Sequence, residues 1–143
     1  MSKLILKKAK HLEGEVDIHG AKNAALPIIA ATLLTDKKCV LHSVPSLSDV
    51  ENMIEILKSL GYEDVTNGFS HTIIPKKITS LKTSYEQTNK LRASFLISGP
   101  LLAKHGKVEI SYPGGCQIGS RPVDLHLKFL ISMIMTRKMK LII

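Results

Sequence analysis

Residues 48–74, SDVENMIEILKSLGYEDVTNGFSHTII, carry the clearest structural pattern in the chain. The stretch opens on a capping box, in which Ser48 is expected to cap a helix and Glu51 to reach back to it. Apolar side chains then recur at helical spacing, and Gly61 is expected to end the helix. These apolar positions are Val50, Met53, Ile54, Leu57 and Leu60. The pattern predicts an amphipathic helix over residues 48–60 with one buried face.

Two short strand-like stretches follow this helix. They are residues 62–65 and residues 71–74, and Asn67-Gly68 lies between them. Because Asn-Gly is a dipeptide typical of tight turns, the two stretches are predicted to pair as a β-hairpin.

The sequence before residue 48 predicts three further elements. Residues 15–19 alternate between apolar and polar side chains, as a half-buried strand does, and residues 23–34 are apolar and alanine-rich, as in a buried helix. Pro27 is expected to limit where that helix can begin. Residues 39–44 predict a second strand. With the hairpin, these elements make one β-α-β-α-β-β unit.

A second round of the same pattern follows the hairpin. Residues 86–104 predict a helix that is interrupted at Gly99-Pro100 and closed by Gly106. Residues 107–111 predict a strand, and a further helix is expected to start at Pro122. The chain is therefore expected to be an α/β (α+β) protein with an incomplete internal repeat. Its 143 residues, 44% of them hydrophobic, are enough for one globular domain.

The positive charge of the chain lies at its two ends. The formal net charge is +8, and all of the excess basic residues lie before residue 11 or after residue 127. Because the body is neutral and aromatic residues make up only 4% of the chain, nucleic-acid binding is not expected. No secretion signal precedes the first elements, so we expect a cytoplasmic protein. No stretch is long and apolar enough to predict a membrane span.

The loop over residues 113–119 combines three glycines with Cys116 and leads into the helix expected from Pro122. The first turn of a helix offers free N–H groups to an anion, so Cys116 is within reach of a negatively charged ligand. Taken alone, the pattern also fits an unremarkable free thiol on a turn. Cys39 lies in a strand-like run and is interpreted as a small core or strand residue. No cysteine or histidine cluster predicts a metal site.

Three motifs favour a functional role for Cys116 over an unremarkable thiol on a turn. They are residues 20–27 (GAKNAALP), residues 91–94 (LRAS) and residues 113–126 (PGGCQIGSRPVDLH). In their order and spacing, they resemble the UDP-N-acetylglucosamine enolpyruvyl transferases, also called UDP-N-acetylglucosamine 1-carboxyvinyltransferases. The resemblance covers residues 10–128, and members of the family are about three times longer. The thiol loop favours this branch over the related enolpyruvylshikimate phosphate synthases.

The resemblance implies a fold as well as an activity. Enolpyruvyl transferases are built from β-α-β-α-β-β units in two similar domains, of the inside-out α/β barrel type, and ligands bind between the domains. Residues 1–128 would form an incomplete part of one domain, and residues 1–19 would pack with the other. The implied reaction transfers the enolpyruvyl group of phosphoenolpyruvate to the 3-hydroxyl of UDP-N-acetylglucosamine and releases phosphate. It is the first committed step of bacterial peptidoglycan synthesis.

The resemblance also assigns residues of the site to phosphoenolpyruvate chemistry. Cys116 is implied as the general acid that protonates the methylene carbon of phosphoenolpyruvate. Lys22 and Asn23 are implied to bind the same substrate, one by charge and the other by hydrogen bonding. Without the resemblance, Lys22 is a solvated lysine.

The UDP-sugar is implied to bind a second set of residues. This set consists of Arg92, Arg121, Pro122, Val123, Asp124 and Leu125. The planar guanidinium group suits bidentate phosphate contacts, although a surface ion pair is the alternative for either arginine. Asp124 has a competing role as a helix N-terminal charge. The family needs no cofactor and no metal for this reaction.

Residues 129–143 depart from the family pattern. They hold three of the five methionines and contain no acidic residue, glycine or proline. A truncated or frame-shifted gene explains this apolar tail better than a designed terminus does. Two alternatives to an active transferase therefore remain: a catalytically inactive remnant, or an interaction module that pairs with a complementing C-terminal fragment.

Overall fold

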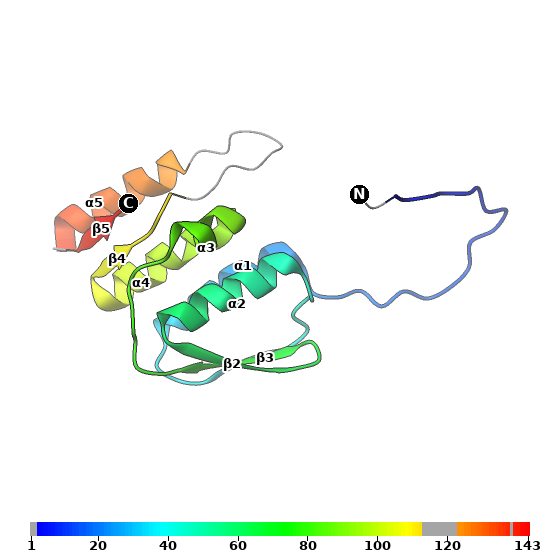
Figure 1. The fold of residues 1–143 in the computed structure, drawn as a ribbon, viewed down its shortest axis with the longest axis horizontal. Helices are drawn as coiled ribbons and strands as arrows, with labels where there is room; N and C mark the ends of the chain where they lie inside the picture. The colour runs from blue at the N-terminus through cyan, green and yellow to red at the C-terminus, as the bar shows by residue number, and fades with distance from the viewer. Residues whose placement is uncertain (1–2, 113–122, 138) are drawn as a thin grey trace.

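The computed structural model of the chain describes residues 3–112, 123–137 and 139–143. In its first half, two helices pack beside a three-stranded antiparallel sheet (Figure 1). The elements are α1 (Lys22–Ala31), the 3-10 helix η1 (Thr32–Leu34), β1 (Cys39–Leu41), α2 (Ser48–Leu60), β2 (Tyr62–Asn67) and β3 (Ser70–Pro75). The sheet has the order β1-β3-β2, and Thr72 of β3 lies opposite Val40 on one side and Val65 on the other.

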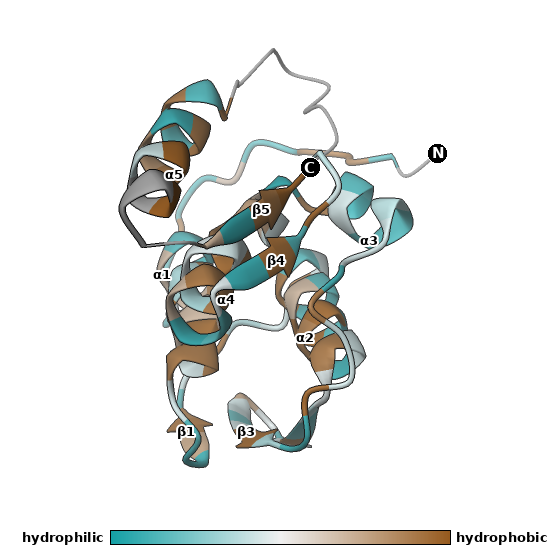
Figure 2. Ribbon diagram, turned by 90° about the vertical axis from the view of Figure 1, so that its left-hand side faces the viewer, coloured by the Kyte–Doolittle hydropathy of each residue, from teal (hydrophilic) through white to brown (hydrophobic). Residues whose placement is uncertain are grey.

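The second half adds three helical segments and a parallel pair of strands. The elements are α3 (Tyr85–Lys90), the 3-10 helix η2 (Arg92–Ile97), α4 (Ser98–His105), β4 (Lys107–Glu109), α5 (Asp124–Arg137) and β5 (Lys140–Ile142). Val108 of β4 lies opposite Leu141 of β5. Because α2 packs against β2 and α4 against β4, helices α1, α2 and α4 lie between the two sheets, and α5 lies at the edge of the molecule beside β5 (Figures 1 and 2). The strands of the described residues form two open sheets and no closed barrel.

The amphipathic helix and the hairpin are confirmed. The five apolar positions of the α2 stripe are all buried, between 0% and 3% exposed, and Gly61 follows the helix in the left-handed conformation with a φ of +106°. The hairpin turn falls on Gly68 and Phe69, one residue later than predicted, since Asn67 still pairs with Ser70. Gly68 supplies the positive φ of +57° that such a turn requires.

The start of α2 differs from the prediction. The helix begins at Ser48 itself, after Leu47, and no side chain caps it. The carbonyl of Leu47 accepts hydrogen bonds from the N–H groups of Val50 and Glu51, at 2.9 and 3.0 Å. Ser48 therefore lies inside the first turn and has no role as the cap. A capping box does form elsewhere in the chain, between Ser84 and Gln87 at the start of α3.

Two predictions about prolines are wrong. Helix α1 begins at Lys22 and contains Pro27, which therefore does not set its start. Since Pro27 has no N–H, it leaves the Asn23 carbonyl without a helical donor, and the helix tolerates this loss near its beginning. The helix predicted over residues 86–104 is broken at Leu91, which is extended, and not at Gly99-Pro100. Pro100 is the third residue of α4, where its missing N–H costs nothing.

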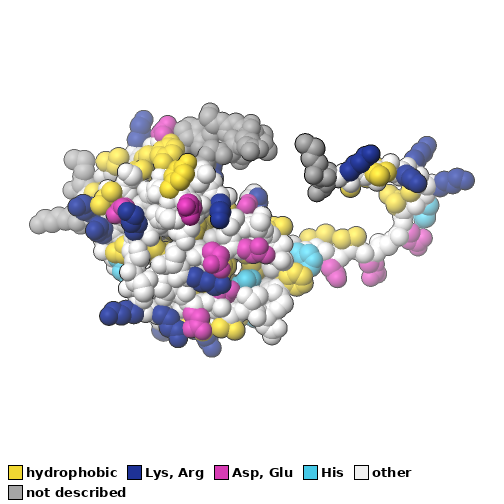
Figure 3. Space-filling model, viewed as in Figure 1, with side chains coloured by type: hydrophobic (Ala, Val, Ile, Leu, Met, Phe, Trp, Pro, Cys, Tyr) yellow, Lys and Arg dark blue, Asp and Glu magenta, His cyan; other side chains and the backbone are white. Residues whose placement is uncertain are grey.

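The strand predicted over residues 15–19 does not form. Residues 3–20 have no regular secondary structure and lead away from the body of the molecule (Figure 3). Val16 and Ile18 are 81% and 90% exposed. An alternating sequence gives a strand one apolar face, but the strand still needs a neighbour for its hydrogen bonds, and no described residue pairs with this stretch.

The apolar tail contributes to a helix and to a paired strand. Part of it continues α5 and part forms β5 beside β4, with a hydrogen bond of 2.7 Å from the Lys140 N–H to the Gly106 carbonyl. Leu130, Ile134 and Leu141 pack against the core. This pairing was not expected from the sequence. Within the described ranges, no helix is long and apolar enough to cross a membrane.

Gly20, just before α1, lies close to the β1–α2 connection. A Cβ atom built on Gly20 would overlap the carbonyl oxygen of Ser43, and Ser43 itself has a positive φ of +56°. Glycine is therefore required at position 20, just before α1.

We predict that Gly20→Ala lowers the free energy of unfolding by about 1–3 kcal/mol, the usual cost of forcing extra atoms into a packed site. Urea unfolding followed by circular dichroism measures this change. Gly14→Ala is the matched control, since a Cβ there meets no atom within 4 Å. Equal unfolding midpoints for the two variants would contradict the close approach.

A buried tyrosine, Tyr62, and a half-buried lysine, Lys104, lie near the other end of α1 and make the free energy of unfolding depend on pH in the alkaline range. Burial raises the pKa of Tyr62 above 10.0, although nearby Lys104 lowers it. Burial lowers the pKa of Lys104, but its hydrogen bond to Asp36 and the neighbouring Tyr62 raise the pKa above 10.5 overall. The Lys104 ammonium also donates to the carbonyl of Thr35 at 2.9 Å. The folded chain therefore holds both protons more tightly than the unfolded chain does.

We predict that these groups contribute their full stabilisation below about pH 10, and that the free energy of unfolding falls as the pH rises above it. Tyr62→Phe removes one of the two titrating groups, so the fall should be shallower in that variant. Urea unfolding at several pH values between about 9 and 11 measures the slope. Tyr85→Phe, at a 63% exposed tyrosine, should leave the slope unchanged. A slope that Tyr62→Phe does not alter would refute this assignment.

Candidate functional site

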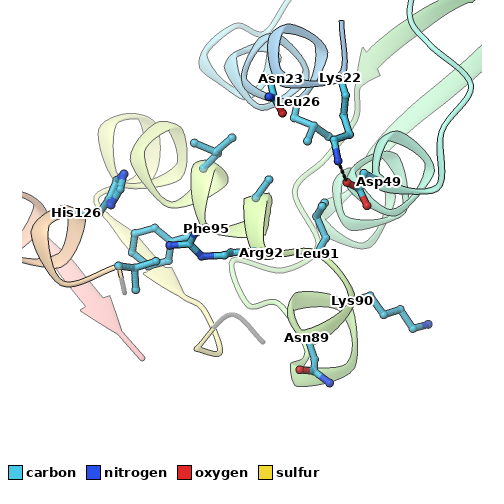
Figure 4. A pocket seen from close by; sticks show the side chains of 13 residues that line it. Lys22, Asn23, Leu26, Asp49, Asn89, Lys90, Leu91, Arg92, Phe95 and His126 are labelled. Atoms are coloured by element: carbon cyan, nitrogen blue, oxygen red, sulfur yellow. Dashed lines mark hydrogen bonds and ion pairs between the residues drawn. The ribbon is translucent and has the colours of Figure 1, made fainter. Parts of the chain in front are cut away.

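One pocket brings together residues from four separate parts of the chain. It has a volume of about 440 Å³ and lies where the beginnings of α1, α2 and η2 face the beginning of α5 (Figure 4). The residues that line it are Lys22, Asn23, Leu26, Asp49, Asn89, Lys90, Leu91, Arg92, Ala93, Phe95, Leu96, Val123 and His126. Four of the residues predicted from the sequence are in this set: Lys22, Asn23, Arg92 and Val123.

Lys22 and Asn23 are the first two residues of α1, and both are exposed. Their place follows from the chain entering α1 in an extended conformation at Ala21, whose carbonyl accepts the first N–H bonds of the helix. The Lys22 ammonium lies 2.7 Å from a carboxylate oxygen of Asp49, in the first turn of α2. The dashed line in Figure 4 marks this ion pair at the edge of the pocket.

Arg92 enters the pocket from the first residue of η2. The extended conformation of Leu91 ends α3 and turns the chain into η2, so that Arg92 is half-buried. Figure 4 shows the Arg92 side chain beside the ring of Phe95, which is 7% exposed. A planar guanidinium group presents its N–H donors in a fixed, fork-like arrangement. This position suits recognition of a phosphate or carboxylate.

The start of α5 completes the pocket on its far side. Val123 is buried at 4% exposure, and the ring of His126 meets Phe95 edge-on, with centroids 6.1 Å apart and planes at 78°. Asp124 and Leu125, predicted as sugar-binding residues, are exposed and do not line this pocket. Leu125 is 78% exposed.

The remaining predicted residues fall outside the part of the chain that the structure describes. They are Cys116, Arg121 and Pro122. Their predicted roles therefore stay predictions.

The sequence analysis missed four polar or charged residues of the pocket. Asp49, Asn89, Lys90 and His126 line it, and none was predicted to do so. Asn89 and Lys90 immediately precede the LRAS motif, which is the one signal that could have indicated them. No sequence signal links Asp49 to Lys22, since they lie 27 residues apart on different helices.

The pocket combines a basic rim with an apolar floor. Lys22, Lys90 and Arg92 carry positive charge, and Asp49 carries the opposing negative charge. The buried side chains of Leu26, Phe95 and Val123 form the floor. A small anion with an apolar part fits this arrangement. In the described ranges, no group of three or more His, Cys, Asp or Glu side chains could hold a metal ion.

Known proteins that are similar to this chain in sequence share one name. A UDP-N-acetylglucosamine 1-carboxyvinyltransferase 2 from Carboxydothermus hydrogenoformans is 49% identical over 128 residues, which are 90% of this chain and 30% of that protein. The UDP-N-acetylglucosamine 1-carboxyvinyltransferase of Methylacidiphilum infernorum is 50% identical over 89% of this chain and 30% of its own length. The chain thus spans about 30% of the length of these relatives. The resemblance drawn from the three motifs is confirmed.

A solved structure resembles the fold. The crystal structure of the enolpyruvyl transferase NikO from Streptomyces tendae superimposes with a TM-score of 0.61, over 66% of this chain and 22% of that chain, at 16% identity. The expected incomplete α/β fold of the enolpyruvyl transferase type is confirmed by this likeness. The sequence model for EPSP synthase (3-phosphoshikimate 1-carboxyvinyltransferase) matches residues 6–137. With nearly the whole chain matched, this protein belongs to the EPSP synthase family.

Proposed function

We propose that the chain is part of a UDP-N-acetylglucosamine 1-carboxyvinyltransferase. The observation that carries the proposal is the convergence of Lys22, Asn23 and Arg92 on one pocket with a basic rim. These residues come from two of the motifs that the chain shares in sequence with that branch of the family. The relatives at 47–50% identity bear the same name. The substrates are phosphoenolpyruvate and UDP-N-acetylglucosamine.

In the proposed reaction the enolpyruvyl group moves from phosphate to sugar. The methylene carbon of phosphoenolpyruvate gains a proton, and the 3-hydroxyl group of the sugar loses its proton as its oxygen bonds to the adjacent carbon, giving a tetrahedral intermediate. The C–O bond to phosphate then breaks, and the methyl carbon returns a proton, so that the products are an enol ether and inorganic phosphate. The reaction needs cations around the phosphate and a proton donor near the methylene carbon.

Lys22 and Asn23 are proposed to bind phosphoenolpyruvate. Both side chains lie at the start of α1, where the free N–H groups of the first turn add to the attraction for an anion. The ammonium supplies charge, and the amide supplies a directed hydrogen bond.

The UDP-sugar is proposed to contact Arg92 and residues 121–125. Arg92 offers the planar donor geometry that fits a diphosphate oxygen pair. Val123 adds an apolar contact from the floor of the pocket. Asp124 and Leu125 are exposed, so their proposed contacts require a ligand that extends beyond the pocket.

Cys116 is proposed as the general acid. A thiol with an ordinary pKa of about 8.5 is largely protonated near neutral pH and can donate to carbon. The glycine-rich sequence around it suits a loop that closes over the substrates.

The proposed enzyme acts in the first committed step of peptidoglycan synthesis, and so in cell-wall formation and cell division. A cytoplasmic location fits the two cysteines, which show no pattern of a disulfide framework. Residues 1–128 are proposed as an incomplete part of one of two domains, and residues 1–19 as the segment that packs on the other. A complementing fragment that supplies the remaining length of the relatives is the proposed partner.

Phosphoenolpyruvate binding tests the first substrate assignment. We predict that Lys22→Met weakens binding of phosphoenolpyruvate about tenfold or more, because a charge-assisted hydrogen bond to an anion contributes about 1.5–3 kcal/mol. Isothermal titration calorimetry or NMR titration of the 143-residue chain measures it. Lys38→Met, an exposed lysine outside the pocket, removes the same charge and should bind as the unmodified chain does. An equal loss of phosphoenolpyruvate affinity in both variants would mean that the net charge of the chain, and not the position of Lys22, determines binding.

Phosphate release tests the complete reaction. We predict release from the chain mixed with a fragment that covers the remaining length of a relative, when both phosphoenolpyruvate and UDP-N-acetylglucosamine are present. Cys116→Ala should abolish this release, since it removes the proposed proton donor, whereas Cys39→Ala should retain it. Release that persists in Cys116→Ala would refute the role of the thiol. A folded mixture without any release would favour an inactive remnant.

A further inference from the structure

We propose that Asp49 is a positioning residue that holds the Lys22 ammonium and competes with incoming anions, so that the pocket accepts phosphate esters and rejects simple carboxylates. This inference rests on the proposed binding of phosphoenolpyruvate at Lys22. It assigns a role to a residue that neither the motifs nor the chemistry of the reaction indicated.

The geometry places Asp49 in direct contact with the proposed substrate-binding lysine. The distance from the Lys22 ammonium nitrogen to the Asp49 carboxylate oxygen is 2.7 Å, within the range of a charge-assisted hydrogen bond. Both side chains line the pocket, and their exposed fractions are 46% for Lys22 and 32% for Asp49. The pair therefore faces the ligand space.

The backbone holds both partners at defined positions. Lys22 is the first residue of α1 and Asp49 is the second residue of α2, and the two helices pack against each other. Asp49 lies in the first turn of its helix, where the helix dipole stabilises a carboxylate. The carboxylate is thus held in place by its own helix and does not depend on Lys22 to stay near the pocket.

This arrangement makes Asp49 a built-in competitor for the ammonium. A free carboxylate offers Lys22 the same charge and the same two oxygens as Asp49, but Asp49 is already present at a high effective concentration. A phosphate ester at neutral pH carries more negative charge and a third acceptor oxygen, and it can contact Arg92 at the same time. A phosphate ester can therefore displace Asp49 where a carboxylate cannot.

The test compares phosphoenolpyruvate with pyruvate, which lacks the phosphate. Amide signals of the first turn of α1 are followed by NMR at constant ionic strength in the 143-residue chain and in Asp49→Asn. We expect Asp49→Asn to bind pyruvate about two- to fivefold more tightly, the range for a partly exposed ion pair, with a smaller gain for phosphoenolpyruvate. The ratio of the Kd for pyruvate to the Kd for phosphoenolpyruvate should therefore be smaller in Asp49→Asn than in the unmodified chain.

Three variants separate positioning from a general charge effect. Glu55→Gln removes the same charge from the same helix and breaks a similar ion pair, with Lys58 at 2.8 Å, but lies outside this pocket. It should leave the preference unchanged. Asp49→Glu retains a carboxylate and should restore most of the preference. In the double variant Lys22→Met/Asp49→Asn, the gain in pyruvate binding should vanish.

The outcomes also separate this inference from the proposed function. If the unmodified chain binds phosphoenolpyruvate in a Lys22-dependent way but Asp49→Asn keeps the same preference, the inference is overturned and the proposed function stands. An equal change in Glu55→Gln overturns the inference as well. If neither ligand perturbs the first turn of α1 in either chain, both the proposed binding of phosphoenolpyruvate and the competition by Asp49 fail.

Discussion

The burial of one face of α2 is the interaction on which the rest of the molecule depends. Met53 and Leu60 are fully buried, and each buried apolar side chain of this size contributes about 1.5–3 kcal/mol. The face packs against β2 on one side and α1 on the other, so that a single helix joins the three-stranded sheet to the remaining helices. It also fixes the end of α2 that carries Asp49. The positions of Lys22 and Asp49 at one edge of the pocket therefore follow from core packing.

Local patterns predicted the parts of this fold that depend on neighbours in sequence. The α2 stripe, Gly61 and the hairpin were predicted because helical spacing, a left-handed glycine and a tight turn are each encoded within a few residues. The break at Leu91 was not, because the extended conformation there serves packing against α1 and α2 that no local pattern records. The capping box predicted at Ser48 does not form, because Leu47 is the residue before the helix and Ser48 is already its first residue.

The residues of the candidate site divide in the same way, into those that local motifs predicted and those that only long-range packing brings to the pocket. Motifs indicated Lys22, Asn23 and Arg92, and the fold brings them to one pocket. Asp49 escaped prediction because its importance comes from a contact across 27 residues, and its place in a helical first turn already accounted for its charge. His126 is the last residue of a motif, but only the edge-on contact with Phe95 gives it a defined place. Sequence thus identified residue types suited to anion binding, and packing determined which of them share a cavity.

The anion binding proposed for this pocket depends on how its charged side chains are arranged and owes little to the net charge of the chain. Residues 11–127 contain as many basic as acidic side chains, twelve of each, and the excess lysines lie near the two ends. Charges separated by more than about 8–10 Å of water are largely screened at physiological ionic strength. The basic residues of the N-terminal segment lead away from the body (Figure 3), so they add little at the pocket. The proposed affinity for phosphate therefore rests on Lys22 and Arg92, which begin α1 and η2, and on Lys90, the last residue of α3.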